Sequence, residues 1–263
     1  MTVGIAPAVV VERSTPMGGA IELVVHHPPA ASALQPGQFF QLAVGAPQAI
    51  LRRPYSAAWA DPVRGRIGFI FNVVGAGSAW LAVRHEGHEL DLLGPLGRGF
   101  NLEGSNHAIV VAGGLGVAVF PGVVHALLAR GRRVTVLLGS RTASQLLPSD
   151  RFAGAEVKTA TDDGSAGHRG SVVELLAGVE AVELFACGPT PMLQAMMRRA
   201  RQLDLPLSSI QVALETPMGC GVGTCLGCAA PRCDGGYLLT CQDGPCLRAD
   251  RIDWDRMTDA FHG

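Results

Sequence analysis

Most cysteines of this chain fall in its last quarter, where their spacing suits metal chemistry. Six of the seven lie between positions 220 and 246, three of them spaced C-x4-C-x2-C with further cysteines following. This is the ligand spacing of plant-type [2Fe–2S] ferredoxins. Interleaved glycines let the backbone wrap closely and point N–H groups at inorganic sulfides. The pattern predicts a [2Fe–2S] cluster held by Cys220, Cys225, Cys228 and Cys241.

Two questions stay open at these cysteines. Cys241 is chosen as fourth ligand because it lies between a strand-like stretch and a turn, whereas Cys233 and Cys246 either take no part or pair oxidatively. A structural zinc site is the alternative metal centre. Zinc sites usually contain paired C-x2-C units, and this sequence has one such unit.

Two glycine-containing turns upstream suit nucleotide phosphates. Gly113-Gly-Leu-Gly116 lies between an apolar run and a helical stretch, and Cys187-Gly-Pro189 also joins a strand to a helix. Free N–H groups at helix N-termini favour negative charge, and open parallel sheets bind ligands beyond the C-termini of their strands. The first turn alone is a weak signal, because many such turns use glycine for packing. Cys187 either contacts a nicotinamide ring or is a buried small hydrophobe.

A third loop on the same predicted face contains Asp162 and Asp163, which either bond ribose hydroxyls or close a turn. The nucleotide-binding residues predicted from the three loops are Gly113, Gly114, Gly116, Asp162, Cys187, Gly188 and Pro189.

The stretch Arg52–Ser56 combines a guanidinium group, an aromatic ring and a hydroxyl. Strand alternation places Arg53 and Tyr55 on one face. Arginine binds a pyrophosphate bidentately, tyrosine can lie against a flat ring, and the Ser56 hydroxyl can bond a flavin atom. The alternative is an ordinary edge strand with a solvated arginine. Gly75–Ser78 opens a short predicted helix with Ser78 as N-cap and offers a second anion site.

Residues 1 to about 100 contain short strands separated by turn residues, which is typical of a small antiparallel barrel. One helix is expected, over Ser78–Glu86. The expected strands are Ala6–Glu12, Ala20–His26, Gln38–Val44, Ala49–Ala57, Arg66–Val74 and His88–Leu92.

From about residue 105, apolar strands alternate with helices, which indicates a parallel α/β sheet. The expected strands are Ala108–Ala112, Val134–Leu138, Ala155–Ala160, Ala181–Ala186 and Ile210–Leu214. The expected helices are a stretch ending at Arg130, Ala143–Leu147, Ser171–Leu176 and Pro191–Leu203. The last segment contains the cysteine loop, a short strand pair and a polar tail. The predicted fold class is therefore multi-domain, α/β plus β: an antiparallel β-barrel (1–101), a parallel α/β nucleotide-binding domain (102–215) and a small cluster domain (216–263).

Composition excludes several classes of protein. The 263 residues carry a net charge of −1, and 48% of them are hydrophobic, enough for a substantial core. A nucleic-acid-binding surface needs a basic excess, and no apolar run reaches the roughly 18 residues of a membrane span. The N-terminus lacks the pattern of a signal peptide, so a cytoplasmic protein is expected. The histidines show no ligand spacing, and no catalytic acid, base or nucleophile is predicted.

Together, the motifs RPYS, GAGS, GGLG, CGP and CGVGTCLGC, in this order, resemble the electron-transfer subunits of class 1B dihydroorotate dehydrogenases, within the ferredoxin–NADP reductase superfamily. The resemblance extends to Thr161-Asp-Asp-Gly-Ser165 and to Cys241-Gln-Asp-Gly-Pro245. The chain departs from the family at several positions: Ser78 replaces threonine, Asn72 stands where a basic residue is expected, and Cys246 replaces an apolar residue. The glycine turn is also slightly altered after its third glycine, where it continues as Val117-Ala-Val-Phe120.

The resemblance implies FAD in the barrel, besides the [2Fe–2S] cluster and NAD. Hydride transfer from NADH involves two electrons and a cluster accepts one, so a flavin converter is required. The expected function is electron transfer between NAD(H) and the FMN of a dihydroorotate dehydrogenase catalytic subunit, in a heterotetramer serving pyrimidine biosynthesis. The apolar stretch around Met218 and Leu226 is expected to face that partner. The predicted FAD-binding residues are Arg53, Pro54, Tyr55, Ser56, Ile70, Phe71, Asn72, Gly77 and Ser78.

Two alternative functions stay open. One is the small subunit of a bifurcating NADH-dependent ferredoxin:NADP oxidoreductase or of a sulfide dehydrogenase, which shares these parts and differs in its partner. The other is a zinc-bearing nucleotide-binding regulator without redox turnover. The sequence does not decide between NAD and NADP, because several arginines could reach a 2′-phosphate.

Overall fold

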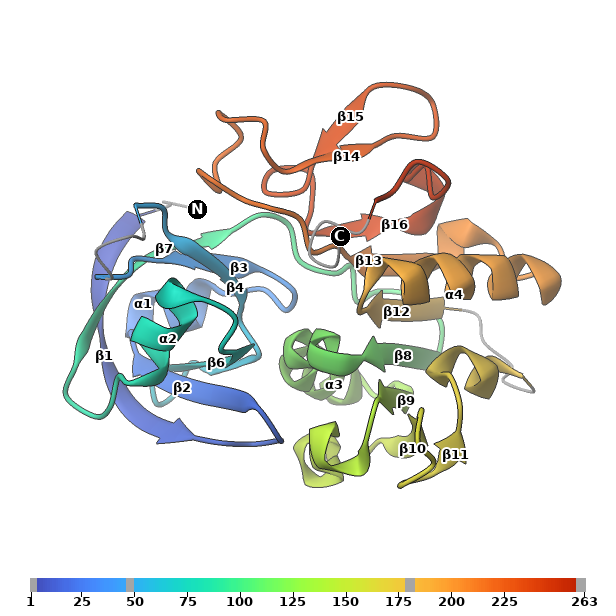
Figure 1. Cartoon of the computed structure of the whole chain (residues 1–263), viewed down its shortest axis with the longest axis horizontal. Coiled ribbons are helices and arrows are strands. Elements are labelled where there is room, and N and C mark those ends of the chain that lie inside the picture. The colour runs from blue at the N-terminus through green and yellow to red at the C-terminus, as the bar shows by residue number, and fades with distance from the viewer. Residues whose placement is uncertain (1–3, 46–49, 178–182, 259–263) are drawn as a thin grey trace.

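The structure of the protein is a computed structural model that describes residues 4–45, 50–177 and 183–258. Within them, two seven-stranded sheets lie side by side, and a small hairpin from the C-terminal segment sits above them (Figure 1). Positions Ala49, Ala181 and Val182 of the predicted strands fall outside the described residues.

The N-terminal part forms a curled antiparallel sheet with the strand order β4-β3-β7-β1-β2-β6-β5. Its inner face is packed with large apolar side chains such as Leu23, Phe40, Phe69 and Phe71, because alternate residues of each strand point inward. Strands β4 and β5 lie at the two edges of the sheet and do not pair with each other, so the sheet is a half-barrel and not a closed barrel. The strands are β1 (Gly4–Ser14), β2 (Ala20–His26), β3 (Phe39–Leu42), β4 (Arg53–Ser56), β5 (Trp59–Asp61), β6 (Arg66–Asn72) and β7 (Glu89–Leu96).

Three details of this sheet differ from prediction. A short helix, α1 (Pro28–Ala33), forms where a turn is predicted, since proline suits the first helical turn and the His27 ring accepts the Ala30 N–H at 3.1 Å. Strand β5 is an addition that pairs with β6. The predicted helix forms as α2, which covers Ala76–Ala82 instead of Ser78–Glu86, and its N-cap is Gly75, not Ser78.

The second sheet has the order β11-β10-β9-β8-β12-β13-β16. All its strands are parallel except β16, and β8 pairs with β9 on one side and β12 on the other. The order therefore reverses beside β8, where open α/β sheets form their ligand crevice. The parallel strands are β8 (His107–Gly113), β9 (Arg133–Ser140), β10 (Glu156–Thr161), β11 (His168–Arg169), β12 (Glu183–Cys187) and β13 (Ile210–Ala213).

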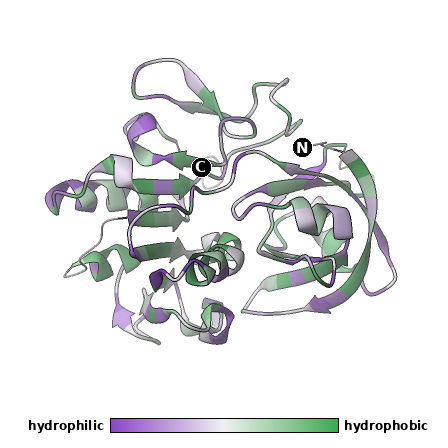
Figure 2. Ribbon diagram, turned by 180° about the vertical axis from the view of Figure 1, so that it is seen from behind, coloured by the Kyte–Doolittle hydropathy of each residue, from purple (hydrophilic) through white to green (hydrophobic). Residues whose placement is uncertain are grey.

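Two α-helices cover opposite faces of this sheet. α3 (Phe120–Ala129) packs in the core shared with the half-barrel, and α4 (Thr190–Gln202) packs in the core of the other face. The strands are largely hydrophobic along their length, as expected for a sheet covered on both sides (Figure 2). The helices predicted at 143–147 and 171–176 are 3₁₀ turns. The 3₁₀ segments are η1 (Gly114–Val119), η2 (Ala143–Gln145), η3 (Ser149–Phe152), η4 (Val172–Leu176), η5 (Leu207–Ser209) and η6 (Ala249–Arg251).

The C-terminal segment is built into the second sheet. β16 (Cys246–Arg248) pairs antiparallel with β13, while β14 (Ala229–Pro231) and β15 (Tyr237–Leu239) form the separate hairpin. Trp254 and Met257 are buried in the core that contains α4. The tail predicted to be polar is therefore partly buried, because its apolar residues Ile252, Trp254 and Met257 pack in that core.

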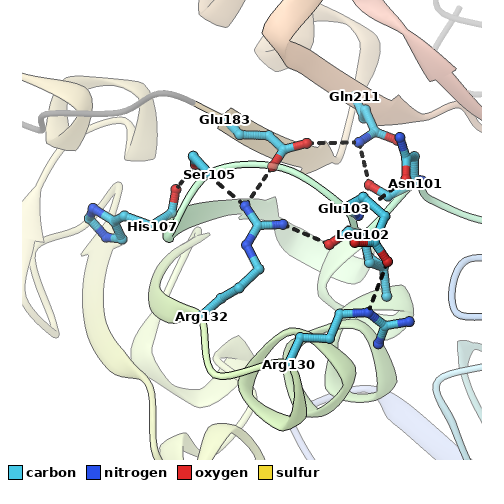
Figure 3. A network of polar contacts seen from close by, with 9 residues as sticks. All are labelled: Asn101, Leu102, Glu103, Ser105, His107, Arg130, Arg132, Glu183 and Gln211. Carbon is cyan, nitrogen blue, oxygen red and sulfur yellow. Dashed lines mark hydrogen bonds and ion pairs between the residues drawn. The ribbon is translucent and has the colours of Figure 1, made fainter.

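Polar contacts fix the two sheets relative to each other. The linker after the half-barrel is bound at the N-terminal edge of the second sheet: Arg132 donates to the Leu102 carbonyl at 2.9 Å and to Glu183 at 2.5 Å (Figure 3). On the other side, Arg151 of η3 donates to both carboxylate oxygens of Glu22 in β2. No helix in the described ranges is long and apolar enough to cross a bilayer.

Candidate redox site

The strand β4 carries Arg53 on the face that meets helix α2. A Cβ at Gly77 would come within 2.6 Å of the Arg53 Nε, so the helix can approach only because residue 77 is glycine. The guanidinium also donates to the Leu51 carbonyl at 2.6 Å. The arginine and the GAGS segment are thus brought together as one surface, which fits the pyrophosphate of a dinucleotide.

Tyr55 lies on the same face as Arg53 and packs against Phe71 of β6, with ring centroids 5.0 Å apart. Burial raises the pKa of Tyr55 to about 12, although the charge of Arg53 opposes the shift. On β6, the Oδ1 atom of Asn72 is buried and has no hydrogen-bond partner among the described residues. Strand alternation places Asn72 on the face of Ile70, opposite to Phe71, and a buried acceptor without a partner is a group that a bound ligand would complete.

Ser78 occupies the third position of α2, and its hydroxyl is already engaged. It accepts the N–H groups of Val74 at 2.8 Å and Gly75 at 3.0 Å, and donates to the Gly75 carbonyl. The side chain closes the start of the helix. Its predicted role toward a phosphate, and those of Pro54 and Ser56, stay predictions. Ile70 is buried in the core shared with η1, so β6 lies against the segment that follows the GGLG turn.

The two predicted nucleotide turns touch each other at the sheet crevice. A Cβ at Gly116 would collide with the Cys187 carbonyl, and a Cβ at Gly188 would lie 3.2 Å from the Gly113 Cα and 2.6 Å from Met192 of α4. Gly114 takes a positive φ of 52° that permits the sharp turn. The turn leads into η1 rather than directly into an α-helix. Burial raises the pKa of the Cys187 thiol to about 12, so the thiol is neutral at ordinary pH.

The aspartate loop lies farther along the same edge. It follows β10, which is separated from β8 by β9. Asp163 closes its own turn, accepting from the Ser165 N–H at 2.9 Å and hydroxyl at 2.6 Å. Asp162 is exposed, and its backbone N–H donates to the Ser140 carbonyl at 3.1 Å. The loop that holds Asp162 is thus separated from the GGLG and CGP turns by strand β9, and its ribose contact stays a prediction.

The four predicted ligand cysteines lie in one region, beside β3 and β7 of the half-barrel. The Sγ atoms of Cys228 and Cys241 are buried 3.2 Å apart, in a small core with Phe39 and Leu96. Cys225 is exposed. Within the described ranges, no three ligand-type side chains already converge on one point.

The cysteine loop offers hydrogen-bond donors to sulfur. Hydrogen bonds from the Thr224 side chain and from backbone N–H groups lower the pKa of Cys220 to about 5, and the Val222 N–H lies 3.4 Å from its Sγ. Burial and the neighbouring Cys228 raise the pKa of Cys241 to about 12. Four thiols with N–H donors around them are the donor set that a [2Fe–2S] cluster requires.

The two remaining cysteines of this segment lie apart from that set. Cys233 is exposed beside the hairpin, whereas Cys246 is buried in the core around α3 with its Sγ 3.4 Å from the Gly37 carbonyl. Both thiols are free. Cys233 and Cys246 lie in different environments and do not form a disulfide in this structure.

The apolar rim of the cysteine loop includes residues from two parts of the chain. Leu226 is 63% exposed and Val222 46% exposed, and Leu51, 55% exposed, lies near Gly219. Met218 instead packs against the Phe39 and Cys228 core. Leu51 was not predicted here, because only the fold brings it to the loop.

Sequence reasoning also missed Gln41, whose fully buried side chain lies against Gly221 of the cysteine loop. A polar residue between Phe40 and Leu42 looks like any outward-facing strand position, so no sequence signal distinguishes it.

Comparisons with known proteins converge on these features. Residues 215–253 match the family model "iron-sulfur cluster binding domain of dihydroorotate dehydrogenase B". The chain is 38% identical over 227 residues to the dihydroorotate dehydrogenase B (NAD⁺) electron transfer subunit of Bacillus caldolyticus, covering 83% of this chain and 86% of that protein. The corresponding subunit of Shouchella clausii is 35% identical over 246 residues, covering 90% and 93%.

Solved structures show the same fold. A structure of an NADH-dependent reduced ferredoxin–NADP oxidoreductase, described in relation to flavin-based electron bifurcation, has a TM-score of 0.85 and 29% identity, covering 96% of this chain and 91% of that one. The ferredoxin reductase of a carbazole 1,9a-dioxygenase has a TM-score of 0.71 at 24% identity, covering 81% and 69%. The predicted fold class is confirmed.

Proposed function

The chain belongs to the family of dihydroorotate dehydrogenase B (NAD⁺) electron transfer subunits, and we propose that it exchanges electrons between NAD(H) and an FMN-containing catalytic subunit that interconverts dihydroorotate and orotate in pyrimidine biosynthesis. The family predicted from the motifs is confirmed. When bound, FAD and a [2Fe–2S] cluster supply the conversion between two-electron hydride chemistry and single-electron transfer.

The residues of the chain provide binding and alignment. Arg53 and the GAGS segment would hold the FAD pyrophosphate, with Tyr55, Ser56 and the β6 residues at the flavin ring. The touching GGLG and CGP turns would hold NAD, with Cys187 near the nicotinamide. Hydride transfer needs alignment and exclusion of water, so these residues need not move a proton.

One observation carries the proposal: strand β3 connects the flavin motif to the cysteines. β3 pairs with β4, which contains the RPYS motif, and its Phe39 packs against Cys228 and Cys241. Two binding regions far apart in sequence are therefore separated by a single strand. That arrangement suits electron exchange between a flavin and a cluster.

The catalytic partner is expected at the exposed rim formed by Leu51, Val222 and Leu226. Leu226 follows the exposed Cys225 in the chain, and a Cβ at Gly219 would lie 3.4 Å from the Cys225 Sγ and 4.0 Å from Leu51. A heterotetramer of two copies of each chain is the assembly we propose. We place it in the cytoplasm, where reducing conditions keep clustered thiols free.

The three functional regions proposed are 1–101 for FAD, 102–215 for NAD and 216–263 for the cluster. The third region shares a core with the second through β16 and Trp254.

The test is anaerobic purification with measurement of iron, sulfide and flavin, followed by addition of NADH. We expect about two irons and one FAD per chain, bleaching by NADH, and co-purification with a dihydroorotate-oxidising subunit. Stoichiometric zinc, or neither iron nor flavin, would contradict the proposal.

A cysteine substitution tests the ligand assignment. Cys225→Ser removes one predicted ligand at an exposed position, so we expect loss of iron and sulfide with FAD retained, because FAD is expected in the half-barrel. Cys233→Ser is the matched control, since Cys233 is also exposed, and it should keep wild-type iron content. Unchanged iron in Cys225→Ser would show that the assignment is wrong.

A second candidate is supported by the structural similarity to the bifurcating oxidoreductase. Its small subunit would share the FAD, NAD and cluster regions and would differ in its partner. Co-purification distinguishes the two functions, and the 38% identity to dihydroorotate dehydrogenase B subunits favours the first. The match of residues 215–253 to an iron–sulfur cluster binding domain argues against the zinc-bearing regulator, and no observation favours that alternative.

A further inference from the structure

The outer face of strand β3 points at the cysteine loop. Phe40 and Leu42 project into the half-barrel core, so Phe39 and Gln41 lie on the opposite face. Phe39 packs against Cys228 and Cys241, and Gln41 packs against Gly221. The Gln41 side chain thus lies between its own strand β3, which pairs with the strand of the flavin motif, and the loop that carries Cys220.

The Gln41 amide is buried without a partner. Its side chain is 0% exposed, and within the described residues neither Nε2 nor Oε1 makes a hydrogen bond. A buried amide without partners costs about 1–3 kcal/mol, so such groups are rare unless something else binds them. Gln38, another buried glutamine, shows the contrast: its Oε1 accepts the Gln35 N–H and its Nε2 donates to the Gly97 carbonyl, both at 2.8 Å.

The loop is shaped around this amide. Gly221 has a φ of +75°, and a Cβ there would come within 2.7 Å of the Gln41 Cγ and 2.9 Å of its Nε2. Only glycine leaves room for the amide beside the loop. Gly221 follows Cys220, whose Sγ already receives donors from Thr224 and the Val222 N–H. The Gln41 Nε2 therefore lies beside the residue that follows Cys220, in the loop whose N–H groups are directed at sulfur.

We propose that the Gln41 Nε2–H group is a hydrogen-bond donor to sulfur on the Cys220 side of the [2Fe–2S] cluster and raises its reduction potential. The inference depends on the proposed function, because it requires the cluster. Reduction adds one negative charge to the cluster, and N–H donors to sulfur favour the more negative state. The donor projects from β3, next to the strand with the flavin motif, so it acts where electrons pass between the two regions.

The test compares the midpoint potential of the cluster in the wild-type complex and in Gln41→Met, by redox titration monitored with electron paramagnetic resonance. Methionine keeps the length of the side chain and removes the donor. We expect the one-electron equilibrium constant for reduction to fall about tenfold, which is about 59 mV toward negative potential. The signal of the reduced cluster should also shift. Gln41→Glu removes the donor and adds negative charge, so its potential should fall further.

Gln38→Met is the matched control. It removes a buried glutamine that already bonds the Gln35 N–H and the Gly97 carbonyl, so it should lower the stability of the protein and leave the potential unchanged. Gln41→Met should show the reverse, a changed potential with stability of the cluster-free chain equal to or above wild type, because no hydrogen bond of that chain is lost.

Several results would overturn the inference. A wild-type potential and resonance signal in both Gln41 variants would show that the amide does not reach the cluster. Loss of iron from both would assign Gln41 to cluster assembly instead of tuning. If the wild-type complex itself contains no iron, the proposed function fails; if it contains iron and flavin but Gln41→Met matches it, only this inference fails.

Discussion

Gly77 and Arg53 act as one unit, because the glycine leaves room for the guanidinium. A Cβ at position 77 would come within 2.6 Å of the Arg53 Nε, whereas a Cβ at Gly75 would meet nothing within 4 Å. We therefore expect Gly77→Ala to displace Arg53 and weaken FAD binding by about 1–3 kcal/mol, the scale of losing a hydrogen bond to a charged group. Flavin content after dialysis measures the effect.

Two comparisons make this prediction specific. Gly4→Ala, at a position outside the GAGS segment where an added Cβ also meets nothing within 4 Å, should keep wild-type flavin content. The double variant Arg53→Ala with Gly77→Ala should lose no more flavin than Arg53→Ala alone, because the glycine acts through the arginine. Full retention of flavin in Arg53→Ala would remove this arginine from the binding site.

The phenol group of Tyr55 makes the free energy of unfolding depend on pH in the alkaline range. Burial raises its pKa from 10.0 to about 12, so the folded state holds the phenol proton more tightly than the unfolded state. This contribution, up to about 2 kcal/mol, is complete below pH 10 and is lost as the pH rises through about 12.

Titration of the tyrosinate absorbance should show a late step that disappears in Tyr55→Phe. The free energy of unfolding of that variant should fall less steeply between pH 10 and about 12. Tyr237→Phe, the control at the only other tyrosine, should keep the late step. If the late step persists in Tyr55→Phe, another group is responsible.

Among the elements, those fixed by local spacing are predictable. Five of the six parallel strands and the two glycine turns follow from short apolar runs and the residues after them, whereas β11 (His168–Arg169) contains no apolar residue and is not predicted. The cysteine spacing predicts a ligand set, and that assignment stays a prediction. Elements that depend on distant partners are not predictable. Cys246–Arg248 becomes a strand only because β13 has a free edge with which it can pair. Gln41 can be recognised as a candidate functional residue only once the fold places it against Gly221. Helix α2 starts at Ala76, two residues before Ser78, because extended Gly75 provides the N-cap.

The contact between β2 and η3 is a buried ion pair that joins the two sheets. The Glu22 side chain is 3% exposed and accepts from Arg151 and, at 2.8 Å, from Trp59. Arg151→Met leaves the carboxylate buried without its cation, which should cost about 3 kcal/mol. Urea unfolding measures the loss.

The control is Arg248→Met, which removes an exposed ion pair with Asp250 and should change stability by less than about 0.5 kcal/mol. Equal effects of the two substitutions would show that the Glu22 pair contributes no more than a surface contact.

At the scale of the whole molecule, the cluster region and the nucleotide sheet share one hydrophobic core, so we expect them to fold as one unit. Leu247, Ile252, Trp254 and Met257 are buried with Met196 of α4. A chain ending at residue 215 would expose this face. Since burial of a large apolar side chain contributes about 1.5–3 kcal/mol, we expect a loss of roughly 6 kcal/mol or more.

Circular dichroism during urea unfolding of the truncated chain tests this, beside the full chain without its cluster. The expected result is aggregation or a much lower midpoint. A truncated chain with the midpoint of the full chain would show that residues 216–263 fold independently of the sheet.

The late return of β16 to β13 has a consequence for biosynthesis. The ribosome releases the N-terminal sheet first, and the nascent chain must then keep the outer edge of β13 unpaired until residues 246–248 emerge. An open strand edge invites pairing with other chains. The cysteine loop leaves the ribosome in that same interval, so iron delivery and closure of the sheet compete with aggregation during one short window of translation.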